Sequence, residues 1–170
     1  MANTQKQATQ FENDIAAEIW RSTNDHTVVR AGYSGNSVMP LPDIFIRSKD
    51  WDTALEIKKS SKKGREEIGV DKEDVRQVWK FSSRNCADTN AVFGFKFSSR
   101  EPILVSLPYT SSDDLEKVFQ RLGNQFEKKE HISYREPNED KYIVEKPDLD
   151  SWNSARSGED MSEKIIDILP

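Results

Sequence analysis

The chain has 170 residues, of which 35% are hydrophobic, and it carries a formal net charge of −5 with a mean hydropathy of −0.80. This length suits one domain with a real core, with or without a tail, and no apolar run approaches the roughly 18 residues of a membrane span. Because the N-terminus lacks the hydrophobic region of a signal peptide, we expect an intracellular, cytoplasmic protein with no membrane partner.

Cysteine and histidine are scarce, which limits the metal sites that the chain can build. Cys86 is the single cysteine, so an internal disulfide and a multi-cysteine zinc site are excluded. The two histidines, His26 and His131, lie far apart in the sequence. A divalent metal would therefore be held mainly by carboxylate oxygens, which favours hard ions such as Mg²⁺ or Mn²⁺.

The first part of the chain predicts one helix followed by short strands. Phe11, Ile15 and Ile19 recur every four residues, so a helix spans about Thr4 to Arg21. A strand at His26–Gly32 follows. Two more strands lie within Pro42–Ser60, and a polar turn joins them. A basic loop from Ser60 to Val70 then ends in a short strand.

The middle of the chain adds a second helix, two strands and a third helix. Asp71 is a suitable N-cap for a helix that ends near Asn85. Strands at Asn90–Phe97 and Pro102–Leu107 and a helix at about Ser112–Leu122 come next. This order predicts an α/β protein with a central mixed β-sheet flanked by helices.

The last part of the chain is acidic, and its structure is harder to predict. Residues 130–170 carry 11 acidic and 5 basic side chains, whereas residues 1–129 carry 19 and 20. "YIVEKP" suggests a strand and "EDMSEKIIDIL" a terminal helix. We expect a core at residues 1–123 and an acidic extension at residues 124–170, which either packs on the core or serves as a tail that binds a protein partner.

Charged residues stand inside two adjacent strands of the segment "PDIFIRSKDWDTALEIKKS". If the turn is centred between Lys49 and Asp50, Asp43 lies opposite Glu56 and Phe45 opposite Ala54. Two opposed carboxylates repel each other unless a cation lies between them, and a divalent ion would suit them. Lys58, on the same face as Glu56, could hold a water and stabilise developing negative charge. The alternative is a cross-strand salt bridge of Lys58 on a solvated sheet face.

Two further features point to the same site. Glu12 borders the buried stripe of the first helix and adds a third carboxylate. The loop between Arg30 and Pro42 contains Ser34, which either donates hydrogen bonds to phosphates or belongs to an ordinary turn. Together these residues outline a site for metal-assisted hydrolysis.

Several motifs in order resemble one nuclease family. "QFENDIAAEI", "VVRAGYSG", "PDIFI", "LEIKKS" and "VDKEDVRQVWKFSSR...VFGFKF", between about Thr9 and Leu107, resemble the archaeal Holliday junction resolvases of the PD-(D/E)xK superfamily. The resemblance implies a restriction-endonuclease-like core, a homodimer and Mg²⁺-dependent symmetric nicking of four-way DNA junctions. Mn²⁺ is expected to substitute for Mg²⁺.

The resemblance also implies roles for single residues. Asp43, Glu56 and Glu12 match metal-binding acids, Ile57 would lend its backbone carbonyl, and Lys58 matches the catalytic lysine. Arg30 and Ser34 match a strand arginine and an active-site serine that contact DNA, and Phe81 matches an aromatic residue at dimer or junction contacts. Asn13 departs from the family, whose members commonly have arginine there.

Recognition of branched DNA by shape needs basic groups spread over a broad surface. Residues just beyond the charged strand can supply them: Lys59, Lys62, Lys63 and Arg65. Two other functions remain open on the sequence alone. One is a restriction or repair endonuclease that acts on duplex DNA, and the other is a non-catalytic DNA-binding module.

Overall fold

The computed structural model describes residues 2–31, 41–60, 67–84, 89–97, 102–108, 117–118, 120–121, 124, 134–138, 140–145 and 161–169. Its centre is a five-stranded sheet in the order β1-β2-β3-β5-β6. The strands are β1 Thr27–Arg30, β2 Ile44–Arg47, β3 Asp52–Lys59, β5 Thr89–Lys96 and β6 Ile103–Pro108. β3 and β5 run parallel, and the other neighbouring pairs run antiparallel. The predicted α/β fold with a central mixed sheet is therefore confirmed.

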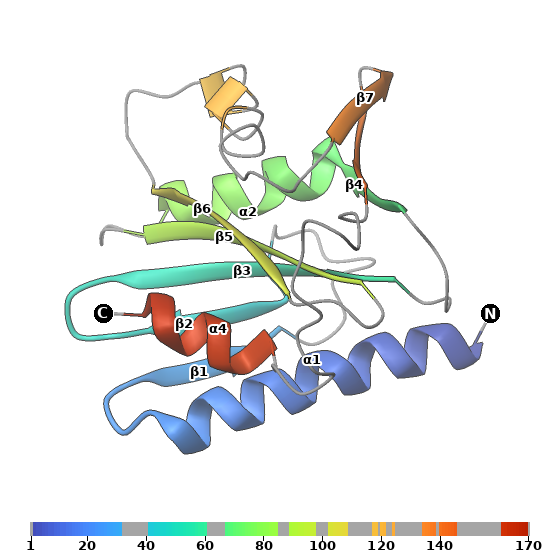
Figure 1. Ribbon diagram of the computed structural model, residues 1–170. Helices are drawn as coiled ribbons and strands as arrows, with labels where there is room; N and C mark the ends of the chain where they lie inside the picture. The colour runs from blue at the N-terminus through green and yellow to red at the C-terminus, as the bar shows by residue number, and fades with distance from the viewer. Residues whose placement is uncertain are drawn as a thin grey trace, which may run out of the picture.

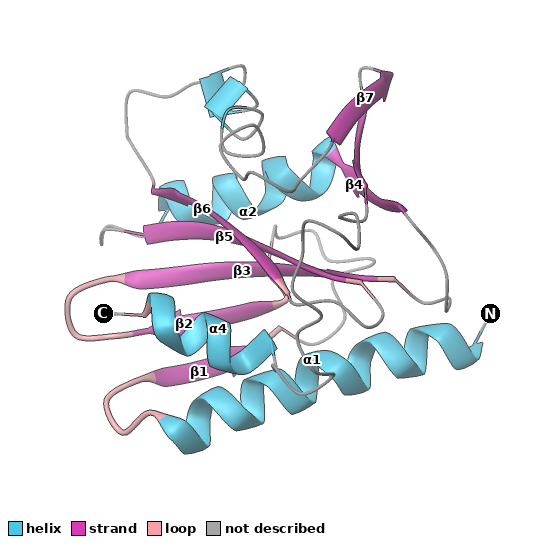
Figure 2. Ribbon diagram, viewed as in Figure 1, coloured by secondary structure: helices cyan, strands magenta, loops and turns pink. Residues whose placement is uncertain are grey.

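Helices cover both faces of this sheet (Figures 1 and 2). The helices are α1 Ala2–Ser22, α2 Lys72–Arg84 and α4 Met161–Ile168. Ile15 and Ile19 of α1 pack with Leu55 and Ile57 of β3. On the other face, Val75, Val78 and Trp79 of α2 pack with Ala54 of β3 and Phe93 of β5. Side chains of a strand alternate between faces, so β3 and β5 contribute to both cores.

A second sheet, which the sequence did not predict, has the order β4-β8-β7. Its strands are β4 Glu67–Asp71, β7 Tyr134–Asn138 and β8 Lys141–Glu145. The short strand at the end of the basic loop and the strand in "YIVEKP" are confirmed as β4 and β8. Tyr142 and Val144 of β8 are fully buried in the core that α2 covers.

The terminal helix is also confirmed, and it packs on the core. α4 contacts α1, and its Met161 and Ile165 are buried between α1 and the sheet (Figure 1). Thus β8 and α4, two described elements within residues 124–170, pack against the rest of the chain. Most of the predicted helix at Ser112–Leu122 lies outside the described residues, as does Cys86, although residues 117–118 and 120–121 are helical. Among the described helices, none has the length and apolar content to cross a membrane.

The burial of α4 predicts that the end of the chain contributes to stability. We expect Ile165→Ala to lower the free energy of unfolding by about 2–5 kcal/mol, because it removes buried methyl groups and leaves a cavity. Urea unfolding followed by circular dichroism measures this change. Ile168→Ala, at an exposed position of the same helix, is the matched control and should change stability little. Equal effects of the two substitutions would contradict the packing of α4.

Candidate active site

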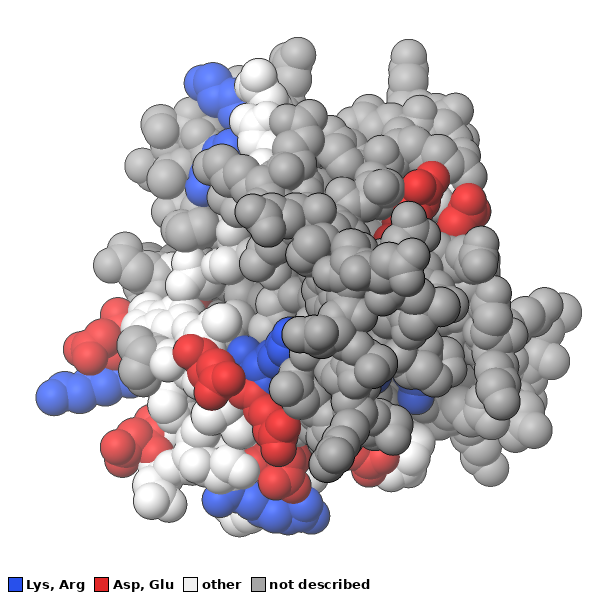
Figure 3. Space-filling model, viewed as in Figure 1, with Lys and Arg blue, Asp and Glu red and all other residues white. Residues whose placement is uncertain are grey.

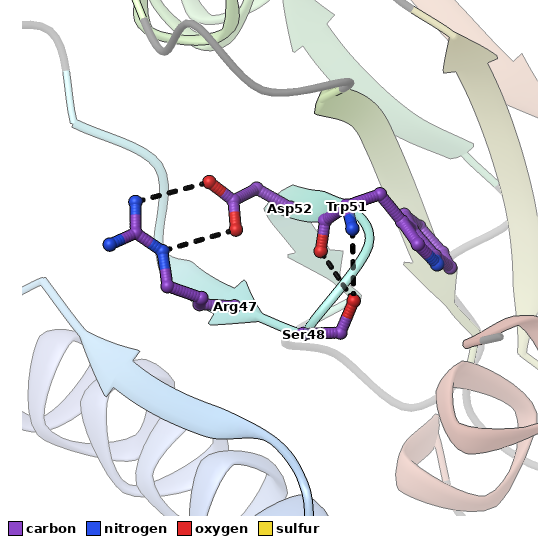
Figure 4. Close-up of polar contacts among 4 residues, drawn as sticks. All are labelled: Arg47, Ser48, Trp51 and Asp52. Carbon is purple, nitrogen blue, oxygen red and sulfur yellow. Dashed lines mark hydrogen bonds and ion pairs between the residues drawn. The ribbon is translucent and has the colours of Figure 1, made fainter.

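The turn between β2 and β3 fixes how the two charged strands align. Arg47 and Asp52 face each other across its base, with Nη2 of Arg47 3.2 Å from Oδ2 of Asp52, whose side chain is 2% exposed (Figure 4). Ser48 Oγ donates to the carbonyl of Trp51 at 2.6 Å and accepts from its backbone N–H at 3.2 Å. Phe45 pairs with Ala54 and Ile44 with Leu55. The predicted register is confirmed, and it brings Asp43, just before β2, next to Glu56.

Backbone contacts hold Asp43 between β1 and β3. Its carboxylate oxygen Oδ2 accepts a hydrogen bond of 2.8 Å from the N–H of Ile57. Its backbone carbonyl accepts one of 3.0 Å from the N–H of Ala31, at the end of β1. Both ends of the residue are thus anchored to the sheet, which limits the directions in which the carboxylate can point.

The half-buried Asp43 and the buried Glu56 both lie where the charged form of a carboxyl group is disfavoured. Burial, and then the charge of Asp43, raise the pKa of Glu56, which is 8% exposed. Burial also raises the pKa of Asp43, against the hydrogen bond from Ile57, and the charge of Glu12 adds to the rise. For both acids, burial and neighbouring negative charges disfavour the ionised form more than the charge of Lys58 favours it. A bound cation would favour the ionised forms by adding positive charge.

Lys58 supplies part of that positive charge. Its Nζ lies 2.8 Å from Oε1 of Glu56 and 2.6 Å from Oδ2 of Asp74. Burial lowers the pKa of Lys58, but the charges of Glu56 and Asp74 outweigh burial and raise it above the ordinary value. Lys58 is therefore a fixed cation at neutral pH. The predicted shared face of Glu56 and Lys58 is confirmed, and their pair lies in a pocket.

Sequence reasoning missed Asp74. It lies in the first turn of α2, and its carboxylate oxygen Oδ2 is 2.6 Å from Nζ of Lys58. The available signal was an acidic first turn after the N-cap position Asp71, a place where acids favour the helix dipole. That signal explains why an acid occurs there, but it does not reveal that the acid meets Lys58.

Glu12 pairs with a basic residue across the gap between α1 and β1. Nη2 and Nε of Arg30 donate to Oε2 of Glu12 at 2.7 and 3.1 Å, and both side chains are mostly buried. Nearby, Nζ of Lys59 lies 4.1 Å from the centre of the Phe11 ring. Arg30 and Glu12 were both predicted at the site, but their pairing was not.

Most of these residues line one pocket of about 430 Å³, whereas Arg30 is not among its lining residues. Its lining includes Glu12, Asp43, Glu56, Ile57, Lys58, Lys59, Asp74 and, from the second sheet, Glu67, Gly69 and Lys141. Four predicted site residues, Ser34, Lys62, Lys63 and Arg65, lie outside the described residues. Phe81 is half-buried beside the core, and its ring meets that of Phe45 edge-on at 5.2 Å.

The donor set of the pocket suits a hard cation. Its candidate ligands are carboxylate oxygens, which Mg²⁺ prefers. Within the part of the chain that the structure describes, no three His, Cys, Asp or Glu side chains stand together as a metal-binding group. Glu12 instead contacts Arg30, and Glu56 contacts Lys58. The assignment of metal ligands stays a prediction.

The surface over α4 and α1 carries charges of both signs (Figure 3). In the view of Figure 3, acidic and basic side chains are interspersed among the described residues over α4 and α1. A surface that binds DNA backbone needs an excess of positive charge. The described residues over α4 and α1 therefore do not form a strongly basic surface of this kind (Figure 3).

Comparisons with family models and with solved structures each found a similar protein. A family model described as archaeal Holliday junction resolvase (hjc) matches residues 3–135. Among solved structures, the chain resembles that of Archaeoglobus fulgidus Hjc, described as a Holliday junction resolvase from an archaeal hyperthermophile. The two are 19% identical with a TM-score of 0.46, over 66% of this chain and 98% of that one. A search of curated proteins found no significant match.

Proposed function

Because the chain belongs to the archaeal Holliday junction resolvase family, we propose that it is an endonuclease that cuts four-way DNA junctions by symmetric, Mg²⁺-dependent nicking. The observation that carries this proposal is the pocket in which Asp43, Glu56 and Lys58 meet. Two acids that need a cation, beside a fixed lysine, suit the hydrolysis of a phosphodiester bond.

We assign Mg²⁺ to Asp43 and Glu56, with Glu12 and the backbone carbonyl of Ile57 as further ligands, and expect Mn²⁺ to substitute. A bound Mg²⁺ supplies Lewis acidity, which favours ionisation of water and stabilises negative charge on a phosphate. The raised pKa values of Asp43 and Glu56 support this assignment, because a dication would stabilise their ionised forms.

The other residues orient the reactants in this proposal. Lys58 stays charged and offers a fixed donor to the attacking water or to the phosphate. Asp74 keeps the Lys58 ammonium beside Glu56, because both carboxylates lie within 2.8 Å of it. The proposed contacts with the DNA backbone are Arg30, Ser34, Lys59, Lys62, Lys63 and Arg65.

Symmetric nicking of two strands requires two equivalent sites, which a homodimer with twofold symmetry provides. We propose that Phe81 takes part in the dimer or junction contact. Its edge-on packing against Phe45 leaves a half-buried aromatic pair beside the core. Aromatic residues are enriched at protein interfaces, which supports this role.

The test is a comparison of two substrates with the full chain and Mg²⁺. We expect nicks in opposing strands of a mobile four-way junction, and little cutting of a linear duplex that contains the same sequences. Equal cutting of both substrates would rule out a resolvase. Cutting at one fixed sequence in the duplex would support a restriction or repair enzyme, and binding without cutting in Mg²⁺ or Mn²⁺ would support a non-catalytic module.

A further inference from the structure

The second sheet forms one wall of the active-site pocket. Glu67, Ile68 and Gly69 of β4 line it, and so does Lys141 of β8. In Figure 1, β4 and α1 lie on opposite sides of the C-terminal end of β3. Lys141 lies beyond the matched residues 3–135. This wall is therefore completed by a strand from outside the part of the chain that the family model describes.

The backbone of β4 positions the side chain of Lys141. Lys141 pairs with Asp71 in the β4–β8 ladder. A Cβ built on Gly69 would lie 2.5 Å from Cε of Lys141 and 3.1 Å from its Nζ. The Lys141 side chain thus crosses the space that any other residue at position 69 would fill. Glycine at this position lets the lysine lie against the sheet and reach the pocket.

The ammonium group of Lys141 is only weakly engaged. Its Nζ lies 3.6 Å from Oδ1 of Asp71, and the two side chains are 42% and 65% exposed. An exposed pair at this distance contributes little, since water screens it. Lys58, in contrast, is held at 2.8 and 2.6 Å by two acids. Lys141 can therefore turn to an incoming anion at small cost.

Acids outnumber lysines in the pocket, so binding of an anion there needs a further cation that is free to turn toward it. Its lining has five acids, Glu12, Asp43, Glu56, Glu67 and Asp74, and three lysines, Lys58, Lys59 and Lys141. A DNA strand brings further negative charge. Lys59 stands on the side of α1, next to Phe11, whereas Lys141 stands on the wall formed by the second sheet. The two lysines would offer cations to the backbone on both sides of the acids.

We propose that Lys141 binds a backbone phosphate of the DNA that enters the active-site pocket. This inference rests on the proposed function, because it assumes a DNA substrate. It gives the second sheet a role in substrate binding, with Gly69 as the residue that makes room for the lysine.

The test measures binding of a four-way junction by fluorescence anisotropy over a range of salt concentrations, in Ca²⁺ to slow cleavage. We expect Lys141→Met to weaken binding about 5-fold and to reduce the slope of log K against log salt by about 0.9, because one phosphate contact is lost. Lys141→Arg should keep both values close to those of the unsubstituted protein. Lys49→Met, at an exposed position in the turn between β2 and β3, is the matched control. It should change neither the affinity nor the salt slope.

The outcomes separate this inference from the function on which it rests. If the unsubstituted protein binds and cuts the junction while Lys141→Met has the affinity and salt slope of Lys49→Met, the role of Lys141 is refuted and the resolvase proposal stands. If the unsubstituted protein does not bind junction DNA, both proposals are refuted. Thermal unfolding of each variant checks that Lys141→Met remains folded.

Discussion

Glu56→Gln is expected to lower the rate of junction cleavage at least about 1,000-fold, which corresponds to about 4 kcal/mol of transition-state stabilisation. The substitution replaces a proposed metal ligand by a neutral amide of the same size. Single-turnover cleavage with saturating Mg²⁺ measures the chemical step, and anisotropy measures binding separately. We expect the affinity for the junction to stay within a few-fold of the original value.

The variant should remain folded for a physical reason. Glu56 is buried, and burial already disfavours its charged form, so an uncharged amide is less costly at this position. Lys58 loses one charged partner but keeps the carboxylate of Asp74 at 2.6 Å. Glu163→Gln, at an exposed position of α4, is the matched control for the chemical change. If Glu56→Gln cleaved at a rate near that of this control, Glu56 would have no part in catalysis.

The alignment of the charged strands was predictable because it depends on local rules. Side chains in a strand alternate, and a short hairpin turn fixes which residues face each other. Placing the turn between Lys49 and Asp50 was therefore enough to predict the pairing of Phe45 with Ala54. The Arg47–Asp52 ion pair strengthens the same register, although the prediction did not depend on it.

Contacts between distant segments were not predictable in the same way. The strand pattern of β8 was visible in "YIVEKP", but nothing local indicated that it pairs with β4, which lies some 70 residues earlier. The contact of Asp74 with Lys58 likewise depends on how α2 packs on the sheet. Periodicity identifies the face of an element, whereas its partner is set by the packing of the whole fold. The same limit applies to the pairing of Glu12 with Arg30.

Lys58→Met tests whether the fixed cation acts in the chemical step. We expect the rate of cleavage of the bound junction to fall about 100- to 1,000-fold, as when a positioned donor is removed from a developing negative charge. Lys59→Met is the matched control, because Lys59 is the next residue of β3 and is exposed beside Phe11. It should weaken binding and leave the rate at saturation within a few-fold of the original.

The contrast between the two lysines follows from their surroundings. Two acids hold the ammonium of Lys58 in place, and their charges keep it protonated, so it can stabilise charge without first being ordered. Lys58→Arg keeps the charge, but its planar group has a different shape and reach, so we expect partial recovery. A rate at saturation that is unchanged in Lys58→Met would show that Lys58 only neutralises Glu56 and Asp74, and the proposed role in the chemical step would then be wrong.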